Sequence, residues 1–379
     1  MNISVRSFVG FCCLVVAAAP VAAQTSRAAV IAEQQAEKAK TLHPYIPNKA
    51  EALITSATRS FIEIPAGFYP AFGSVYSGGG FTLGGGYRRF YGDRSMWDAH
   101  GLFSVKSYKL LELSTTSPGH AKGHVDLYGR TTWRDAPTVA FYGIGNDTVK
   151  DDKVNFALRE SSVTGGLRAR TARWIVLRGE LAYEDFTTTV PGPGADITFV
   201  HGTATAGFDS RPSPGYARHG GFYGVEYHNY ADRADAYSFE RVDGEAIQHI
   251  PILRENWVLS FRGRVQTTLG DAVVPAFLLP SLGSGSTLRA YSSWRFRDRH
   301  SELMSAEFRW IPNRLGLDMA LFYDAGKVTS ERRELDFDGL TSNVGIGVRF
   351  HGPLATPLRI ELAHGREGMH LVFSGGPAF

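Results

Sequence analysis

The sequence has almost no cysteine and no long apolar run. Its two cysteines, Cys12 and Cys13, lie next to each other near the start, so no disulfide framework holds the rest of the chain together. The apolar stretch FVGFCCLVVAAA is well short of the roughly 20 residues that a membrane-spanning helix needs. A formal net charge of only +3 gives no reason to expect a polyanion as the partner.

The first 23 residues are typical of a secretory signal peptide. Arg6 precedes the apolar run, Pro20 interrupts it, and VAA ends at Ala23 as a small-residue cleavage site before Gln24. Residues 1–23 are therefore predicted to be removed on export, and both cysteines would leave with them. The mature chain would then be an exported protein without cysteine.

Residues 24–73 are predicted to form a short periplasmic helical segment. The stretch QTSRAAVIAEQQAEKAKTLHPYIPNKAEALITS is rich in Ala, Glu, Lys and Gln, which favours a helix ending before Pro44 and a second helical piece after a turn. This segment is too short for a folded domain of its own, and no helical period continues beyond it.

From residue 74 to residue 379 the pattern is that of half-buried strands. Apolar and polar residues alternate in segments such as WIVLRGELAYEDF, WVLSFRGRVQT, VGIGVRFH and LRIELA. Two all-β architectures fit this pattern, a soluble sandwich and a transmembrane barrel with a wet interior. The polar face carries Arg and Glu on strand after strand in an exported chain, which favours the barrel, because backbone groups in a bilayer must pair within a closed sheet.

Direct counting of the alternating segments gives about fourteen strands. Nine precede residue 269 and five follow residue 300, and the connection of residues 269–300 between them is far longer than a usual link. It contains VVPAFLLPSLGSGSTLRAY, which is too apolar for a solvated tail, so it is expected to pack against something. The strands are expected near 76–91, 96–114, 121–135, 153–171, 173–187, 196–210, 219–231, 235–249, 254–268, 301–312, 315–327, 341–352, 356–365 and 368–379.

The chain end MHLVFSGGPAF is predicted to be the last strand of the barrel. It places Met369, Leu371, Phe373 and Phe379 on one face and ends on phenylalanine. It looks like the terminal strand of an outer-membrane barrel, which in that class carries the signal for assembly; Phe373 and Phe379 would belong to that signal.

Several motifs in order resemble the barrel of the Omp85 superfamily, the BamA/TamA or surface-antigen D15 group. They are LPSLGSGSTLRAYSSWRFRD, EFRW, FYDAGKV and VGIGVRF, with FYGIGNDT at 141–148 similar to an early loop of the family. The resemblance implies sixteen strands, two more than the direct count, with the missing pair within 54–76, 136–145 or 153–171. It also implies a barrel without the periplasmic POTRA domains that most members carry, since the segment before residue 74 is too short for one.

In that family the long loop folds back into the lumen as a lid, here residues 269–300, and its tip arginine pairs with the aspartate of the F-x-D-x-G strand. Carried over, Arg289 would pair with Asp324 and lock the lid. Ala290 stands where the family has a glycine, so a positive φ there would be strained. The other lid-motif residues are Leu288, Ala290, Tyr291, Arg295, Phe296 and Asp298, and the lumen-facing partners expected from alternation are Glu307, Arg309, Asp318 and Arg349.

The sequence gives little reason to expect catalysis or a metal. GSGST at 283–287 is not the G-x-S-x-G elbow of a hydrolase, and the twelve histidines show no convincing ligand spacing. No cofactor, metal or catalytic residue is predicted. The glycine-rich stretch SGGGFTLGGG at 77–86 is interpreted as a flexible first strand, because no helix follows it to present a phosphate site.

The leading hypothesis is an outer-membrane barrel of a Gram-negative bacterium that aids insertion or translocation of polypeptide, or of lipid. The resemblance implies outer-membrane lipid, an unfolded polypeptide client and a periplasmic protein as partners. Nucleic acid is not expected as a partner, because the chain is nearly neutral. The alternative is a passive or gated channel, or a structural barrel, that kept the lid but lost the assembly role. An outer-membrane enzyme is the third and weakest hypothesis, for want of a nucleophile and base.

Overall fold

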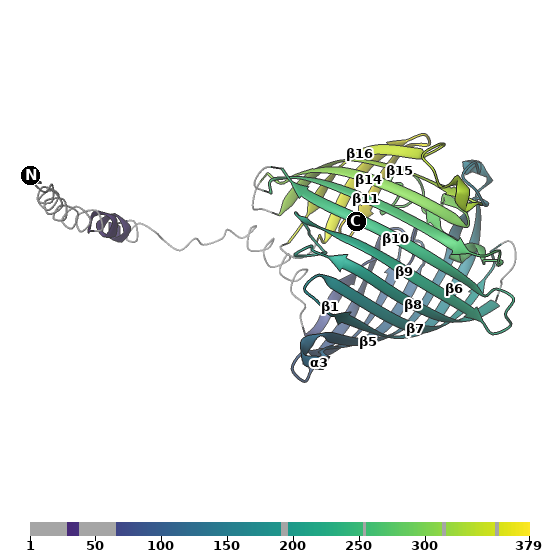
Figure 1. Ribbon diagram of the computed structural model, residues 1–379, viewed down its shortest axis with the longest axis horizontal. Helices are drawn as coiled ribbons and strands as arrows, with labels where there is room; N and C mark the ends of the chain where they lie inside the picture. Colours follow the sequence, from purple (N-terminus) through teal and green to yellow (C-terminus); the bar gives the residue numbers. More distant parts are fainter. Residues whose placement is uncertain (1–28, 38–65, 191–195, 253–254, 313–315, 353–355) are drawn as a thin grey trace, which may run out of the picture. The chain divides into compact units, whose positions relative to one another are not determined.

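The computed structural model describes residues 29–37, 66–190, 196–252, 255–312, 316–352 and 356–379 (Figure 1). The predicted signal peptide lies outside these ranges, as does most of the predicted periplasmic segment, apart from a helix over residues 29–37. Within the described ranges, no helix is both long enough and apolar enough to cross a membrane. The chain divides into two units, residues 1–57 and 58–379, and all strands among the described residues belong to the second.

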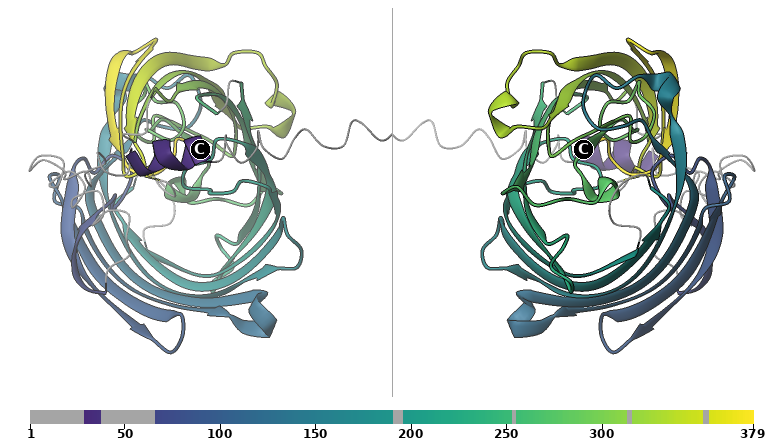
Figure 2. Two further views of the ribbon diagram at one scale, coloured as in Figure 1. Left: turned by 90° about the vertical axis from the view of Figure 1, so that its left-hand side faces the viewer. Right: turned by 90° about the vertical axis from the view of Figure 1, so that its right-hand side faces the viewer.

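Sixteen antiparallel strands follow one another in a single curled sheet (Figures 1 and 2). Short helical turns lie between some of them: α3 (His120–Gly123), η1 (Lys150–Asp152) and η3 (Arg332–Glu334). The strands are β1 (Gly67–Phe72), β2 (Thr82–Tyr91), β3 (Ser95–Ser104), β4 (Lys109–Gly119), β5 (Val125–Phe141), β6 (Val154–Arg170), β7 (Ile175–Thr188), β8 (Asp196–Asp209), β9 (Gly220–Asp232), β10 (Phe239–Pro251), β11 (Trp257–Leu269), β14 (His300–Trp310), β15 (Leu317–Thr329), β16 (Thr341–Phe350), β17 (Leu358–Gly365) and β18 (Gly368–Ser374).

The sheet begins at β1 and ends at β18, and in the described part of the chain these two strands are not paired with each other. Every other neighbour is joined by an antiparallel ladder, from β1–β2 through to β17–β18. The outer edges of β1 and β18 therefore keep backbone groups that no strand of the described sheet satisfies. Such edges readily pair with another strand.

Alternation divides the two faces of the barrel as predicted from the sequence. On β15, Met319, Leu321 and Tyr323 are exposed on the outside, while Asp318 and Asp324 are fully buried inside. The same outward exposure of large apolar side chains recurs around the sheet, for example at Leu181, Val225 and Ile346. An apolar outside and a charged inside are what a bilayer-spanning barrel requires.

The fold class is confirmed, and the direct count of fourteen strands is corrected to sixteen. One missing strand is β1, which lies within the predicted 54–76 window and starts the barrel before the expected boundary at residue 74. The other was hidden in 96–114, which is two strands, β3 and β4, joined by a tight turn in which Ser107 has a φ of 64°. The windows 136–145 and 153–171 hold no extra strand, because β5 and β6 are long single strands.

The predicted terminal strand also needs correction. β18 ends at Ser374, and the following Gly375-Gly376-Pro377 turns the chain away from the sheet, with Gly376 at a φ of +82°. Phe379 therefore does not share the outer face with Phe373. Its ring lies inside the barrel, stacked on His249 of β10 with 6.2 Å between centroids, and Figure 2 shows the chain end within the ring of strands.

The lid lies between β11 and β14 and passes inside the ring of strands (Figure 2). It contains a helical turn, η2 (Ala276–Leu278), and a two-residue ladder between β12 (Ser281–Leu282) and β13 (Phe296–Arg297). The start of the lid is apolar and packs on the inner wall, where the Phe277 ring lies 5.0 Å from that of Phe186 on β7. Burial of this apolar segment explains why so hydrophobic a connection is stable.

Candidate functional site

The tip of the lid carries Arg289 into a buried cluster of charges on the inner wall. Its Nε and Nη2 donate to the two oxygens of Asp324 at 2.9 and 2.8 Å, which is a bidentate pair. Nη1 donates to Glu307 at 3.2 Å and to Glu361 at 3.1 Å. Burial lowers the pKa of the Arg289 guanidinium, but the carboxylates of Asp324, Glu307 and Glu361 together outweigh burial, so the pKa of Arg289 is raised. Arg289 thus stays charged and joins three strands through one side chain.

Three more arginines balance the carboxylates around Arg289. Arg349 on β16 donates to both oxygens of Glu307 and, at 2.8 Å, to Glu361. Arg359 on β17 donates to the other oxygen of Glu361 at 2.8 Å, and Arg309 on β14 lies 3.7 Å from Glu307. Every member is almost completely buried. We refer to these residues as the lock cluster: Arg289, Glu307, Arg309, Asp324, Arg349, Arg359 and Glu361.

The aromatic ring of Phe322 and the absence of a side chain at Gly345 give the Arg289 guanidinium its packing surface. The Arg289 guanidinium lies over the face of Phe322, 3.4 Å from the ring centroid. Phe322 lies in turn against Gly345 of the neighbouring strand, where a Cβ would stand only 2.3 Å from the ring. Asn343, two residues before it, donates to Asp324 at 2.8 Å and so fixes the carboxylate. The inward position of Gly345 is therefore what leaves room for the ring on which the lid arginine rests.

A second part of the lid, Trp294 and Arg295, contacts the loops on the β1 side of the sheet as well as the turn before β18. The indole of Trp294 donates to the Ser77 carbonyl at 3.0 Å and stacks on Tyr76 with 5.1 Å between centroids. Both contacts are in the β1–β2 loop. Arg295 donates to Thr148 in the β5–β6 loop and pairs with Glu367 in the β17–β18 turn at 2.7 Å. The lid therefore connects loops next to β1 with loops next to β18.

We expect Trp294→Ala to loosen the lid on the β1 side without disturbing the lock cluster. Loss of this partly buried indole with its one hydrogen bond costs about 2 kcal/mol, which corresponds to roughly thirtyfold more frequent opening. Trypsin digestion of the folded barrel, followed at the lid arginines, measures this opening. Cleavage at the wild-type rate would show that Trp294 does not hold the lid.

The opposite end of the barrel is filled by two other segments. In the β8–β9 loop, Tyr216 donates to Asp318 at 2.8 Å and the Ala217 carbonyl accepts from Arg309. The tail after β18 lies beside this loop, because Thr356 accepts from the Gly376 N–H at 2.8 Å and its hydroxyl donates to the Gly215 carbonyl at 3.2 Å. The Gly376 carbonyl also accepts from Arg359 at 3.0 Å. The second oxygen of Asp318 lies 3.0 Å from His351 Nε2. Asp318 therefore belongs to this end of the barrel, away from the lid tip. The lumen beside the lock cluster is thus occupied from both ends.

The structure brings together some of the predicted site residues and separates others. Arg289, Asp324, Glu307, Arg309 and Arg349 meet in the lock cluster, and Phe322 lies beneath it. Asp298 remains in the lid, next to its own chain, where burial raises the pKa of its carboxyl group. Ala290 is not among the described residues with positive φ, so the expected strain is absent. Leu288, Tyr291 and Phe296 pack together on the side of the lid that faces the wall, in one apolar core with wall residues such as Leu303.

Sequence reasoning missed Glu361, Arg359 and Asn343. Glu361 is completely buried and receives hydrogen bonds from three arginines. A signal did exist, because Arg359 and Glu361 form the polar face of LRIELA. The family pattern drew attention to the lid tip and its aspartate, and alternation by itself does not say which inward carboxylate the lid reaches.

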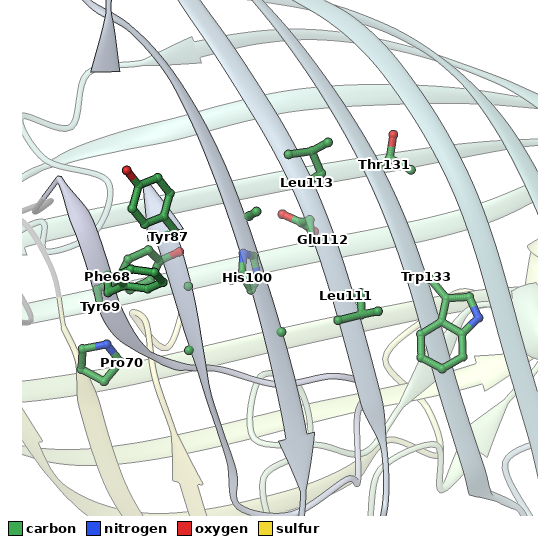
Figure 3. Close-up of a pocket in the computed structure, with 14 residues that line it drawn as sticks. Phe68, Tyr69, Pro70, Tyr87, His100, Leu111, Glu112, Leu113, Thr131 and Trp133 are labelled. Atoms are coloured by element: carbon green, nitrogen blue, oxygen red, sulfur yellow. The ribbon is translucent and has the colours of Figure 1, made fainter. Parts of the chain in front are cut away.

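A shallow apolar groove of about 900 Å³ lies over β1 to β5 (Figure 3). Its floor includes Gly85, Gly101 and Ala99, and larger side chains such as Phe68 and Trp133 stand around it. Phe68 is 88% exposed, at the unpaired side of the sheet. The groove therefore offers an apolar surface beside the free edge of β1.

The chain is similar in sequence to one protein family and in fold to several solved structures. The family model of the Omp85 superfamily domain matches residues 219–368. A search of curated proteins found no significant match. BamA from Haemophilus ducreyi, lacking POTRA domains 1–3, aligns with a TM-score of 0.62 and 16% identity over 82% of this chain and 69% of that one. CdiB from Acinetobacter baumannii aligns with a TM-score of 0.55 and 9% identity over 78% of this chain and 56% of that one. CdiB from Escherichia coli aligns with a TM-score of 0.57 and 13% identity over 83% of this chain and 60% of that one.

Proposed function

We propose that this protein aids the insertion or translocation of polypeptide at the outer membrane, because residues 219–368 match the Omp85 superfamily domain and belong to a sixteen-stranded barrel. The family and the apolar outer face indicate a barrel of the Gram-negative outer membrane. The observation that carries the proposal is the pair of unpaired edge strands, β1 and β18, spanned on the inside by the lid.

An unpaired strand edge provides the chemistry for handling an unfolded polypeptide. An incoming strand can satisfy the free N–H and C=O groups of such an edge by antiparallel pairing, which needs no particular side chains. Outward-facing side chains of the new strand would then lie beside Phe68, at the β1 side of the apolar groove, in contact with lipid. In this proposal the bilayer lipid and an unfolded polypeptide are the partners, and no catalytic group is required.

The lid is proposed to hold the two sides of the edge together until a client arrives. It contacts the β1–β2 loop through Trp294 and the β14–β17 wall through Arg289. Because both anchors lie on one segment, release of either would let the edges move apart. The lock cluster would then set how often this occurs, since buried pairs break rarely unless both charges find new partners.

Co-reconstitution in liposomes tests the proposal. We expect an unfolded outer-membrane barrel to acquire protease protection several times faster in liposomes containing this protein than in empty liposomes. Liposomes with an unrelated outer-membrane barrel of similar size are the matched control. A rate equal to that control would remove insertion by the protein alone.

The passive-channel alternative gives a different result in planar bilayers. The lid, the β8–β9 loop and the tail all lie inside the barrel, so we expect little steady conductance from the wild type and a clear rise when the lid is shortened. High steady conductance that hardly changes on shortening the lid, without acceleration of folding, would favour the channel.

A further inference from the structure

Two histidines face each other on the inner wall, outside the lock cluster. His201 of β8 and His228 of β9 are largely buried, and His201 Nε2 lies 3.1 Å from His228 Nδ1. The Thr203 hydroxyl lies 3.2 Å from the first nitrogen and 3.4 Å from the second. Tyr230 is stacked on the His201 ring with 3.8 Å between centroids, which holds the ring in place. Three potential donor atoms therefore converge on one point.

The nitrogens on the far side of each ring face carboxylates. His201 Nδ1 lies 3.0 Å from Glu184, and His228 Nε2 lies 3.1 Å from Glu226, although off the ideal hydrogen-bond direction. A carboxylate favours the tautomer that presents an N–H to it. Glu184 thereby leaves a lone pair on His201 Nε2. Where His228 turns its N–H toward Glu226, its Nδ1 presents a second lone pair 3.1 Å away, and a cation between the two nitrogens stabilises this arrangement.

The surrounding charges also favour a cation at this point. Arg178 of β7 pairs with Glu226 at 2.9 Å, and Arg241 of β10 pairs with Asp243 at 2.9 Å, so these arginines already have partners. Glu184 forms its ion pair with His201, and no lysine or arginine of the described chain pairs with it. The histidine pair thus lies beside a carboxylate whose charge no basic side chain neutralises.

We propose that His201 and His228 bind a divalent transition-metal ion of the class that imidazole prefers, Zn²⁺, Cu²⁺ or Ni²⁺. Ligand atoms about 2.0–2.1 Å from a tetrahedral ion stand about 3.3–3.4 Å apart. The triangle formed by the two nitrogens and the Thr203 oxygen has sides of 3.1, 3.2 and 3.4 Å, close to one face of such a tetrahedron. Lumen water would fill the remaining position.

The carboxylates complete the pattern of a metal site. Histidines that bind metals usually donate their other N–H to a carboxylate, which orients the ring and makes the free nitrogen more basic. Glu184 has this relation to His201. In the described residues no group of three or more His, Cys, Asp or Glu side chains is arranged to hold a metal. The site therefore supplies two strong donors, and moderate affinity with exchangeable water is expected.

Metal titration of the folded barrel in detergent tests the proposal. We expect one equivalent of Zn²⁺ or Cu²⁺ to bind by calorimetry, Mg²⁺ not to bind, and the Cu²⁺ complex to show nitrogen hyperfine coupling in its electron paramagnetic resonance spectrum. His201→Gln and His228→Gln should each weaken binding at least tenfold, and Glu184→Gln about tenfold. His219→Gln, which changes an exposed histidine, is the matched control.

Heat-modifiable gel mobility establishes that each variant is folded before titration. Loss of the bound equivalent in both histidine variants, with retention in the control, supports the site. No saturable binding to the wild type, or binding that survives in either histidine variant, overturns the proposal and leaves a proton shared by the two imidazoles as the cation. This test does not depend on the proposed role in polypeptide insertion.

Discussion

Arg289→Ala is expected to release the lid tip and to destabilise its docking by about 3–5 kcal/mol, the range for breaking one partner out of a buried ion pair. Asp324 is completely buried, and Arg289 is the basic side chain that pairs with it in the described structure. Without Arg289, the carboxylate keeps Asn343 as its side-chain donor. Limited proteolysis of the lid and urea unfolding in detergent measure the change.

Two further variants separate loss of the lock from a general effect of losing charge. Arg333→Ala removes an arginine that is mostly exposed and pairs with Glu331 at the surface, so it should change stability by less than about 0.5 kcal/mol. Arg289→Ala combined with Asp324→Asn should recover part of the loss, because the orphaned charge is gone. If Arg289→Ala behaves like Arg333→Ala, the lock cluster does not hold the lid.

A disulfide between Gly78→Cys and Ser293→Cys is expected to abolish the proposed insertion activity reversibly. A Cβ built on Gly78 stands 3.3 Å from the Cβ of Ser293, slightly below the roughly 3.5–4.5 Å usual for a disulfide, so a small shift of the lid backbone forms the bond. The bond would tie the lid to the β1–β2 loop. If the edges must part for a client, folding of the client in liposomes should fall to the rate without protein.

Addition of a reductant should restore the rate, which distinguishes locking from misfolding. The positive φ of 88° at Gly78 makes cysteine there cost about 1 kcal/mol, so each single-cysteine variant is measured as a control. Replacement of Cys12 and Cys13 by serine excludes other disulfides. Full activity of the oxidised double variant would show that the lid need not leave the β1–β2 loop.

The wall of the barrel was predictable because alternation is a local property. One inward and one outward face repeat along each strand, so Asp318, Phe322 and Asp324 could be assigned to the inside from their neighbours in sequence. The length and apolar composition of residues 269–300 likewise indicated a buried connection. Resemblance to a family was needed to connect Arg289 with Asp324, which lie on different segments.

The errors have local physical causes. The turn between β3 and β4 is Val105-Lys106-Ser107-Tyr108, without glycine, proline or asparagine, so it gave no turn signal although Ser107 adopts a positive φ. β1 is six residues long and contains Pro70, which weakens its strand pattern. The tail was read as strand to Phe379 because its apolar parity continued past the glycines that in fact turn it inward.

The sequence by itself therefore determined the class of fold, the inward and outward faces and the presence of a lid. The tertiary structure decided which inward side chains meet, because the stagger of strands around a barrel sets which residues of β14 to β17 lie level with the lid tip. That stagger brings Glu361 to Arg289, sends Asp318 to the other end, and brings His201 opposite His228. In the described sheet the tertiary structure also leaves β1 and β18 unpaired with each other. No local pattern can report this, because pairing of the edges would join the two most distant strands of the sheet.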